Sequence, residues 1–545
     1  MSLTSIMNSA TTGLIAAQTQ LRVVSDNVAN VNTEGYVRKI ADQAAVTTQG
    51  MGAGVNISRI RLATDRFLQA ASLQAGSEAQ RQGTRAELYD RVQSLFGDPS
   101  GDGGFFGQID RLFSTFAAAS ENATSSPLRQ DALFKLQSVF DETTRISGQI
   151  QAVREDADGR IKSAVARAND LFQQIENLNV EISRATISGH DASGAESAQA
   201  GLIDELAGIM DIRVSVRPVG GVSIRTGTGL LLAGDGAATL SYDRAGAVNA
   251  ETLFDEIWIT EPRGSKRSLQ DHLGSGELKG LVEIRDQDAP AAAERLAELT
   301  TRVADELNRA HNASSAVPPP RTLTGRNVGM SEVEALRGFT GSTTIAVTNA
   351  AGVIQSKATV VFSGGTMTVN GAPATPSDFL SVLQTQLGGA AVATVGFSNG
   401  VLSISATNAA NGVAIADDPA NPSDKAGRGF SHFFGLNDLV STDRPALYET
   451  GLVGGSAHGF AQDQSVTFRM TGPAGSRLRD VTFVIPAGVT TMSQLIAELN
   501  SPATGVGAYG TFQLDGAGRL GFTAATGSGY SLSVAQDTTT QSPSG

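Results

Sequence analysis

An unbroken apolar stripe at the start of the chain constrains its fold more than any other feature. The stripe residues alternate in steps of four and three, and they are Leu3, Met7, Ala10, Leu14, Ala17, Leu21, Val24 and Val28. This spacing is typical of a coiled-coil seam, and the helix would be roughly 40 Å long. We call these eight residues the seam. Periodicity alone leaves two interpretations open: a helix packed by other helices of an assembly, or an amphipathic helix docked on its own domain.

The residues around the seam carry little charge. Residues 1–50 hold three basic and three acidic side chains, whereas an exposed coiled coil carries Glu and Lys at its flanking positions. Small polar side chains on all sides suit a helix that is packed by copies of itself and by related proteins. After Val28 the chain is rich in Asn and Gly, which tolerate left-handed backbone, so the helix is predicted to end in a tight turn.

The turn carries a motif with ordered positions. The motif residues are Asn27, Ala29, Asn30, Asn32, Thr33, Gly35 and Tyr36. This run resembles the N-terminal signature of the flagellar axial proteins, the family of rod, hook and hook-associated proteins. Arg38, two residues after Tyr36, makes the chain similar to the hook-associated proteins that join hook to filament. The resemblance favours the first interpretation, in which the seam is an assembly surface.

The resemblance extends through roughly residues 1–312. It includes Gly52-x-Gly54-Val55, the passage from Leu202–Leu206 into Val214–Val216, and a helix that ends at Leu307–His311. It implies a self-assembling structural subunit of the extracellular flagellum, exported without a cleaved signal peptide. The implied partners are hook protein, a second hook–filament junction protein, copies of the chain in a ring, an export chaperone and the flagellar export apparatus.

The resemblance also implies a second heptad helix, at the C-terminus, that would pack beside the first. The chain instead stops in Gln541–Gly545, directly after a β-rich stretch. Either the chain is truncated or the resemblance fails at the C-terminus. We expect truncation, in which the partner helix of the seam is missing, because the seam otherwise has no evident partner. Two alternatives stay open: another flagellar axial protein such as hook protein, or an extracellular adhesin with a β-rich stalk.

Composition excludes several other classes of protein. The 545 residues carry a net charge of -13, which opposes nucleic-acid binding because affinity for phosphates comes mainly from Lys and Arg. With no cysteine, the chain has no disulfide, no thiolate nucleophile and no Cys-ligated metal. No apolar run approaches the ~20 residues that span a bilayer, so we expect no membrane insertion. The N-terminus lacks the basic and apolar regions of a signal peptide.

Stripe and strand patterns predict a multidomain α+β fold. Long helices are expected over residues 59–97 and 105–188, with a helix start at Ser126-Pro127, and short strands over residues 212–285. Pro318–Pro320 marks a linker. The expected domains are an axial helix and turn (1–50), a long-helix bundle with a β insertion at about 212–285 (51–330), and two β-rich outer domains (331–460 and 461–545). The second outer domain is a possible repeat of the first.

Nothing in the sequence has the spacing of a catalytic or metal site. The five histidines stand outside any HExxH arrangement, and no GxSxG or GxxxxGK[ST] motif occurs. We therefore expect no catalytic residue, no metal, no cofactor and no enzymatic activity. The residues predicted to matter are the eight of the seam and those of the signature, with Arg38 as the last of them.

Overall fold

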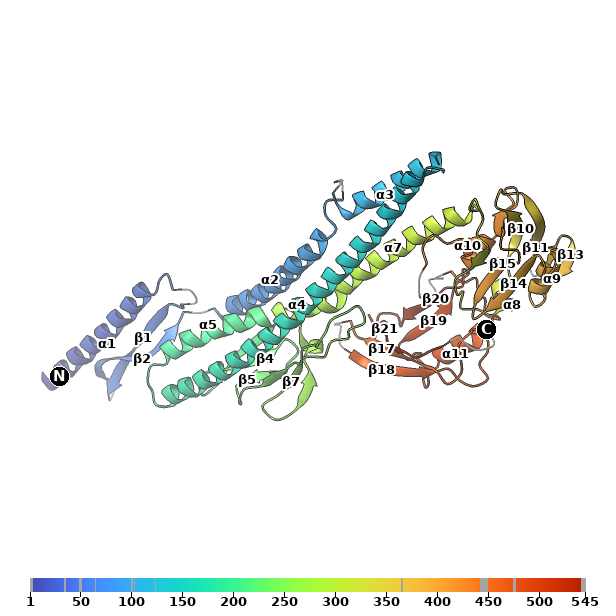
Figure 1. Cartoon of the computed structure of the whole chain (residues 1–545). Coiled ribbons are helices and arrows are strands. Elements are labelled where there is room, and N and C mark those ends of the chain that lie inside the picture. Colours follow the sequence, from blue (N-terminus) through green and yellow to red (C-terminus); the bar gives the residue numbers. More distant parts are fainter. Residues whose placement is uncertain are drawn as a thin grey trace. The chain divides into compact units, whose positions relative to one another are not determined.

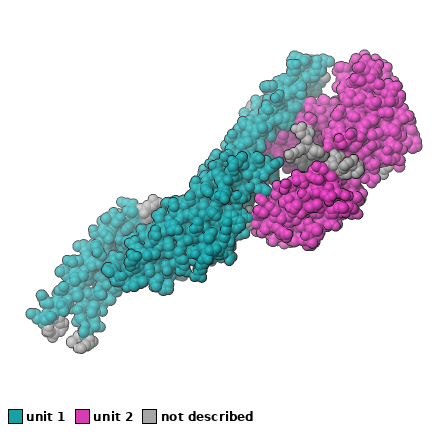
Figure 2. Space-filling model, turned by 60° about the horizontal axis from the view of Figure 1, so that its bottom comes forward, with its two compact units in different colours: residues 1–294, 474–476 teal, residues 295–473, 477–545 magenta. Residues whose placement is uncertain are grey.

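The computed structural model describes most of the chain and divides it into two compact units. Unit 1 holds residues 1–294 with 474–476, and unit 2 holds residues 295–473 with 477–545 (Figure 2). The described residues are 3–33, 36–48, 51–63, 65–99, 101, 103–122, 124–363, 366–441, 449–473 and 477–540. The signature residue Gly35 and the segment Gln541–Gly545 lie outside them. The four-domain division expected from the sequence stays a prediction.

Unit 1 begins with a helix and a hairpin, which together we call the N-terminal arm (Figure 1). Helix α1 (Leu3–Ala29) is followed by the antiparallel strands β1 (Lys39–Thr48) and β2 (Met51–Leu62). The helix packs mainly on β2 and to a smaller extent on β1. The register between the strands is irregular at Asp42/Gln43 and at Val46/Thr47. The predicted end of the helix at the Asn-rich turn is confirmed.

The helix expected from residue 59 begins later, because the last residues of β2 occupy that segment. Arg59 and Arg61 both reach the carboxylate of Asp42 across the hairpin, at 3.4 and 2.9 Å, and this holds them in the strand. Helix α2 (Arg66–Ser94) starts where the side chain of Asp65 accepts hydrogen bonds from two backbone N–H groups of its first turn. A capping carboxylate, and not the apolar pattern, sets this boundary.

The rest of unit 1 is built on long helices. The segment over residues 105–188, where long helices were expected, forms two helices, of which the first ends at Glu121 and the second begins at Ser126. The predicted start at Ser126-Pro127 is confirmed, since Pro127 lies in the first turn. The helices after α2 are α3 (Phe105–Glu121), α4 (Ser126–Ile187), α5 (Ser193–Ile209), α6 (Glu277–Glu283) with a π-helical turn over Ile284–Asp288, and α7 (Ala289–Asn312), which continues into unit 2.

A β insertion separates α5 from α6. It forms two three-stranded antiparallel sheets, with the orders β3-β4-β5 and β6-β7-β8. Its strands are β3 (Ile212–Val216), β4 (Val222–Thr226), β5 (Leu231–Ala233), β6 (Thr239–Ser241), β7 (Trp258–Thr260) and β8 (Lys266–Ser268). Short strands in this segment are therefore confirmed. Residues 277–288 are helical instead, and their side chains Leu278, Leu281 and Ile284 are fully buried.

Unit 2 contains two β modules, each with its own core. The first β module, residues 322–436, buries a group of aromatic rings in which Phe339 contacts Phe430, Phe433 and Phe434. Its sheets have the strand orders β13-β12-β11-β10-β16 and β14-β15-β9. Its elements are β9 (Thr322–Thr324), α8 (Glu332–Leu336), β10 (Thr340–Asn349), β11 (Ile354–Ser363), β12 (Thr366–Val369), β13 (Ala372–Ala374), α9 (Phe379–Gln386), β14 (Ala393–Ser398), β15 (Val401–Ala406), β16 (Asn411–Asp417) and α10 (Phe430–Phe434).

The second β module, residues 465–537, follows the order of the first with fewer strands. Its elements are β17 (Ser465–Thr471), β18 (Arg477–Val484), α11 (Met492–Leu499), β19 (Gly510–Leu514), β20 (Leu520–Ala524) and β21 (Ser531–Asp537). Strand β17 pairs with both β18 and β21, as β10 pairs with both β11 and β16. In each module a helix and a hairpin precede the last strand. The repeat predicted from the sequence stays a prediction, and this shared order supports it.

The predicted fold class, mixed α+β with long helices first and small antiparallel sheets after them, is confirmed. Within the described ranges, no helix is both long and apolar enough to cross a membrane. Over the same part of the chain, no group of three or more His, Asp or Glu side chains is arranged to hold a metal ion.

Candidate assembly surface

The structure places the whole seam on the exposed side of α1. Leu3, Leu14 and Leu21 expose 80%, 62% and 71% of their surface. The remaining seam residues are exposed as well, and they are Met7, Ala10, Ala17, Val24 and Val28. The described residues of the chain therefore leave an apolar row uncovered along the full length of the helix.

The helix attaches to its hairpin through the opposite side. Ala16 and Val23 are buried, and each follows a seam residue by two positions, which places it about 200° around the helix. Thr12 and Thr19 on the same side are half-buried. The helix thus docks by its small and polar side and turns its apolar side outward. This is the reverse of an amphipathic helix docked on its own domain.

Asn27, the first signature residue, fastens the end of α1 to the start of β1. Its Nδ2 donates to the carbonyl of Lys39 at 2.9 Å, and its Oδ1 accepts from the backbone N–H of Lys39 at 2.8 Å. The Tyr36 hydroxyl donates to the same Oδ1 at 3.0 Å. The amide of Asn27 therefore satisfies both backbone groups of one β1 residue, as a neighbouring strand would.

The other signature residues shape the turn between α1 and β1. Asn30 Nδ2 donates to the carbonyl of Asp26 at 2.9 Å, and the Thr33 hydroxyl donates to Oδ1 of Asn30 at 3.3 Å. The side chain of Arg38 is exposed. The remaining members are exposed or undescribed: Ala29 and Asn32 are exposed, and Gly35 lies outside the described residues. The described part of the signature thus fixes the geometry of the turn.

Sequence reasoning did not identify why α1 and the hairpin can approach each other. Gly54 of β2 has a φ of +123°, and a Cβ at this position would collide with the side chain of Thr12 on α1. The N–H of Val55 lies 3.4 Å from the Thr12 hydroxyl. The pattern Gly52-x-Gly54 was visible, but its role depends on which helix crosses the strand. Gly54 joins Asn27 among the residues that orient the seam.

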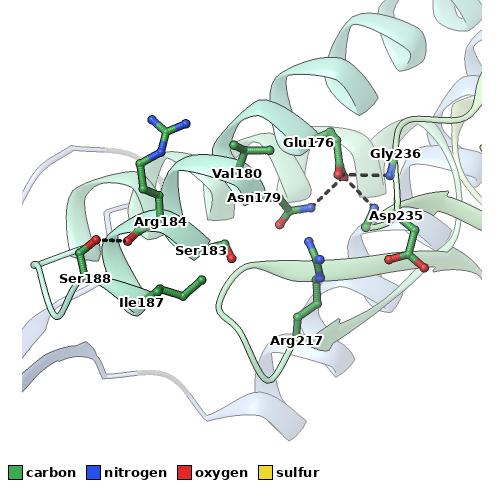
Figure 3. Close-up of a pocket in the computed structure, with 11 residues that line it drawn as sticks. Glu176, Asn179, Val180, Ser183, Arg184, Ile187, Ser188, Arg217, Asp235 and Gly236 are labelled. Atoms are coloured by element: carbon green, nitrogen blue, oxygen red, sulfur yellow. Dashed lines mark hydrogen bonds between the residues drawn. The ribbon is translucent and has the colours of Figure 1, made fainter.

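Unit 1 also contains a pocket of about 450 Å³ (Figure 3). It lies between the last turns of α4 and the segments that carry Arg217 and Asp235. The carboxylate of Glu176 accepts hydrogen bonds from the N–H groups of Gly234 and Gly236 at 2.8 and 3.2 Å. These bonds tie the β insertion to α4, so the central acid of the pocket has a structural role.

Two polar clusters, each with at least one buried member, contain residue types that also occur in catalytic sites. In unit 1, Arg285 and Asp158 are 1% and 0% exposed and both bond the Tyr242 hydroxyl, whose pKa burial raises above its ordinary value. In unit 2, Asp305 lies 3.0 Å from Nε2 of the buried His432. Burial alone would raise the pKa of Asp305, but the bond to His432 and the charge of a nearby arginine hold that pKa well below its usual range. Both clusters join segments that are distant in sequence.

Two protein families match the sequence of this chain. "Flagellar hook-associated protein FlgK helical domain" matches residues 89–317, which hold the helical bundle and the β insertion. "Flagella basal body rod protein" matches residues 7–36, which hold most of the seam and the signature. The two regions that the sequence analysis singled out are therefore the regions that known families share.

Flagellar hook-associated protein 1 of Salmonella typhimurium is 28% identical over 317 residues, and that of Bacillus subtilis is 25% identical over 338 residues. These matches cover 57% and 66% of the two relatives and 57% and 56% of this chain, so the chain spans less than two thirds of the curated relatives it matches. The solved structure of the flagellar hook junction protein FlgK from Burkholderia pseudomallei is 17% identical in sequence. The match covers 88% of this chain and 86% of that chain, with a TM-score of 0.39. In sequence, the chain is therefore similar to flagellar hook-associated protein 1, through its N-terminal segment and the helical domain at residues 89–317.

Proposed function

We propose that the chain is a structural subunit of the hook–filament junction of the extracellular bacterial flagellum, and that it works by assembly and not by catalysis. One observation carries the proposal: all eight seam residues are exposed on a helix whose other side is already docked. The similarity to flagellar hook-associated protein 1 is the reason for placing this assembly in the flagellum. A helix that presents a continuous apolar row outward is suited to being covered by other chains.

The exposed seam represents free energy that assembly can release. Full burial of a Leu or Val side chain is worth roughly 1.5–3 kcal/mol, and the seam contains Leu3, Leu14, Leu21, Val24 and Val28. Helix propensity does not recover this amount in a lone helix. Arg22 is the first charged side chain of the sequence, so most of the seam can be covered without burying a charge.

The proposed partners follow from this setting. Hook protein would lie on one side of the subunit and a second hook–filament junction protein on the other, while further copies of the chain complete a ring. A C-terminal heptad helix of the kind that the resemblance implies would be a further cover for the seam. An export chaperone and the flagellar export apparatus would handle the chain before assembly. The net charge of -13 disfavours nucleic acid as a partner.

The contacts of the signature supply the mechanism in this proposal. Asn27 fixes the last turn of α1 on Lys39, and Gly54 lets the middle of the helix lie close to β2. With both contacts made, Ala16 and Val23 face the hairpin and the seam faces outward. In this proposal the signature fixes the orientation of α1 on its hairpin. Every copy of the chain then presents the same apolar row to its neighbours.

A matched pair of substitutions tests the proposal. Val24→Asp places a charge in the seam, and Val180→Asp places one on α4. The two valines are 55% and 53% exposed, so neither change should unfold the free subunit. In cells that lack their own junction subunit, we expect Val180→Asp to restore filament attachment. We expect the Val24→Asp chain to be secreted but not incorporated, since burial of an unpaired charge is costly. Normal motility and normal filaments with Val24→Asp would contradict the proposal.

Hook protein itself is the second candidate, since the match at residues 7–36 is to a rod protein and does not separate axial proteins from one another. The helical-domain match at residues 89–317 favours the junction subunit. Immunogold labelling of isolated flagella distinguishes the two. A narrow band of label between hook and filament supports the junction subunit, whereas label along the whole hook supports hook protein.

A further inference from the structure

One arginine lines the pocket between α4 and the β insertion without a partner for its charge. Arg217 is half-buried, and its side chain reaches from the turn between β3 and β4 toward α4 (Figure 3). Within the described ranges, no carboxylate forms an ion pair with its guanidinium group. The other arginine of the lining, Arg184, is exposed and points away from it (Figure 3). A charge that has lost part of its water without gaining an anion is costly, so this pocket favours a ligand that supplies one.

The two acids of the same pocket are already engaged. Glu176 accepts hydrogen bonds from the backbone N–H groups of two glycines and from the side-chain amide of Asn179, the last at 3.0 Å. Asp235 pairs at 3.4 Å with Arg263, which does not line the pocket. Each acid therefore has its partner elsewhere in the chain, and the guanidinium group of Arg217 is left for an anion from outside.

The place of Arg217 is fixed by the turn that carries it. Gly220 and Gly221 have φ angles of +88° and +77°. A Cβ at Gly220 would collide with the side chain of Thr186, and one at Gly221 would collide with that of Asn179. The two glycines therefore let the turn lie directly on α4. This contact holds Arg217 at the wall of the pocket before any ligand arrives, which lowers the entropic cost of binding.

The remaining wall of the pocket is aliphatic. Val180 and Ile187 lie two turns apart on the same side of α4, and they are 53% and 75% exposed. A planar carboxylate matches the fork of an arginine. A doubly charged phosphate is less suitable, because the carboxylates of Glu176 and Asp235 line the same pocket and would repel it more strongly. The matching ligand is thus a single carboxylate beside an aliphatic group.

We infer that this pocket receives an Asp or Glu side chain of a neighbouring protein chain. Arg217 pairs with the carboxylate, and Val180 and Ile187 pack on an aliphatic residue beside it. One arginine and two aliphatic side chains hold a small free acid only weakly, so the carboxylate acts as part of a larger contact, in which a desolvated arginine contributes strongly. The inference rests on the proposed function, because assembly supplies the neighbouring chain.

The chemistry of the pocket can be tested on the purified full chain. The probe is isocaproate, a carboxylate with a branched aliphatic end, and its neutral counterpart isocaproamide is the control ligand. Methyl NMR follows the resonances of Val180 and Ile187. We expect isocaproate to shift both resonances saturably and isocaproamide to leave them unchanged. Arg217→Ala should weaken binding of isocaproate by about tenfold or more, since charge-assisted hydrogen bonds are lost.

Two further variants sharpen this measurement. Arg213→Ala removes an exposed arginine of β3 that does not line the pocket, and it should leave binding of isocaproate unchanged. Arg217→Lys keeps the charge without the fork and should restore part of the binding. The inference is wrong if the acid and the amide give equal shifts, if neither shifts the resonances saturably, or if Arg217→Ala binds isocaproate as the wild type does.

Charge reversal in cells tests whether a neighbouring chain supplies the carboxylate. Arg217→Glu should be secreted but poorly incorporated at the hook tip, whereas the matched control Arg213→Glu should be incorporated normally. Circular dichroism of the purified chains checks folding, and Arg217→Gln takes the place of Arg217→Glu if the latter does not fold. If the wild-type chain is absent from the junction, the proposed function fails, and this inference fails with it. If the wild type is present and the Arg217 variant is incorporated as well, only this inference fails.

Discussion

Helices α1 and α4 carry the same kind of apolar stripe, and the structure treats the two stripes in opposite ways. The stripe of α4 has seven residues. Leu178 is half-buried, and the other six are exposed by 4% or less: Ile161, Val165, Ala168, Phe172, Ile175 and Ile182. Along α1 every residue of the seam is exposed, and Leu21 exposes 71% of its surface. Steps of three and four residues therefore predict which side of a helix seeks burial. They do not predict whether the same chain provides it.

The opposite side of each helix explains the difference. Across from its stripe, α4 carries exposed charged side chains such as Lys162, Arg167 and Glu181. This is usual for a helix whose apolar side is buried within its own chain. Across from its seam, α1 carries small residues that already pack on the hairpin. Between Leu3 and Leu21, α1 has no charged side chain that marks one side as the side that faces water. The polar side of a helix is thus the better guide to whether its apolar side is covered within one chain.

Truncation of one side chain in each stripe should give the largest contrast. Phe172→Ala removes a fully buried ring from α4, and we expect it to lower the free energy of unfolding of the helical domain by about 3–5 kcal/mol. Leu21→Ala in the seam should change the same quantity by less than about 0.5 kcal/mol. Urea denaturation of the purified monomer, followed by helical circular dichroism, measures both. A comparable loss in the two variants would mean that the free monomer already covers its seam.

A buried lysine in the first β module shows how burial acts on a charged group, which the seam of α1 does not contain. Lys425 is buried, its Nζ donates to the carbonyls of Glu334 and Ala335 at 2.6 and 3.0 Å, and burial lowers its pKa to about 7. The unfolded chain, where the pKa is near 10.4, then binds more protons above pH 7. The free energy of unfolding of unit 2 should therefore rise with pH between 7 and 9, by up to about 1.4 kcal/mol per pH unit.

The variant Lys425→Met should lose this rise, and Lys357→Met, at an exposed lysine of the same module, should keep it. Urea denaturation at pH 7, 8 and 9 with a probe in unit 2 measures the slope. A slope that is unchanged in Lys425→Met would show that the ammonium group is not desolvated in the native fold.

The smallest expected effect concerns how α1 is attached. Because the helix docks by hydrogen bonds and little apolar area, Asn27→Ala should free α1 without unfolding the bundle. It removes three hydrogen bonds, two to Lys39 and one from Tyr36, at a local cost of roughly 1–2 kcal/mol. Hydrogen exchange should accelerate in α1 and stay slow in residues 160–186 of α4. Tyr36→Phe removes one of the three bonds and should give a smaller acceleration; unchanged exchange in Asn27→Ala would remove Asn27 from this role.

Much of the fold could be predicted from the sequence because its signals are local. The turn after Val28, the helix start at Pro127 and the short strands of the β insertion each follow from a few neighbouring residues. The misplaced start of α2 shows where local reasoning ends. Residues 59–62 belong to a strand because Arg59 and Arg61 pair with Asp42, which lies seventeen and nineteen positions earlier. The capping signal of Asp65 was available and would have placed the boundary correctly.

The candidate assembly surface likewise contains residues whose role could be predicted from the sequence and residues whose role could not. The seam could be read from the sequence, since its spacing is periodic. The role of Asn27 could not, because the amide acts on Lys39, twelve residues away, and only the folded turn brings the two together. Gly54 is a similar case, since its missing side chain matters only where Thr12 crosses the strand. Family resemblance marks such residues without stating their physical role.

In both β modules, residues at the start lie against residues at the end. Asn312, before the first module, donates from its Nδ2 to the carboxylate of Asp438, just after that module, at 2.8 Å, and Val466 near the start of β17 faces Asp537 at the end of β21. The chain therefore enters and leaves each module at one place. A whole module can be lost, doubled or exchanged for a different one, and the ends left behind still meet. The β modules are therefore free to be replaced in evolution, whereas the N-terminal arm, in which a helix, a hairpin and one asparagine must match, is not.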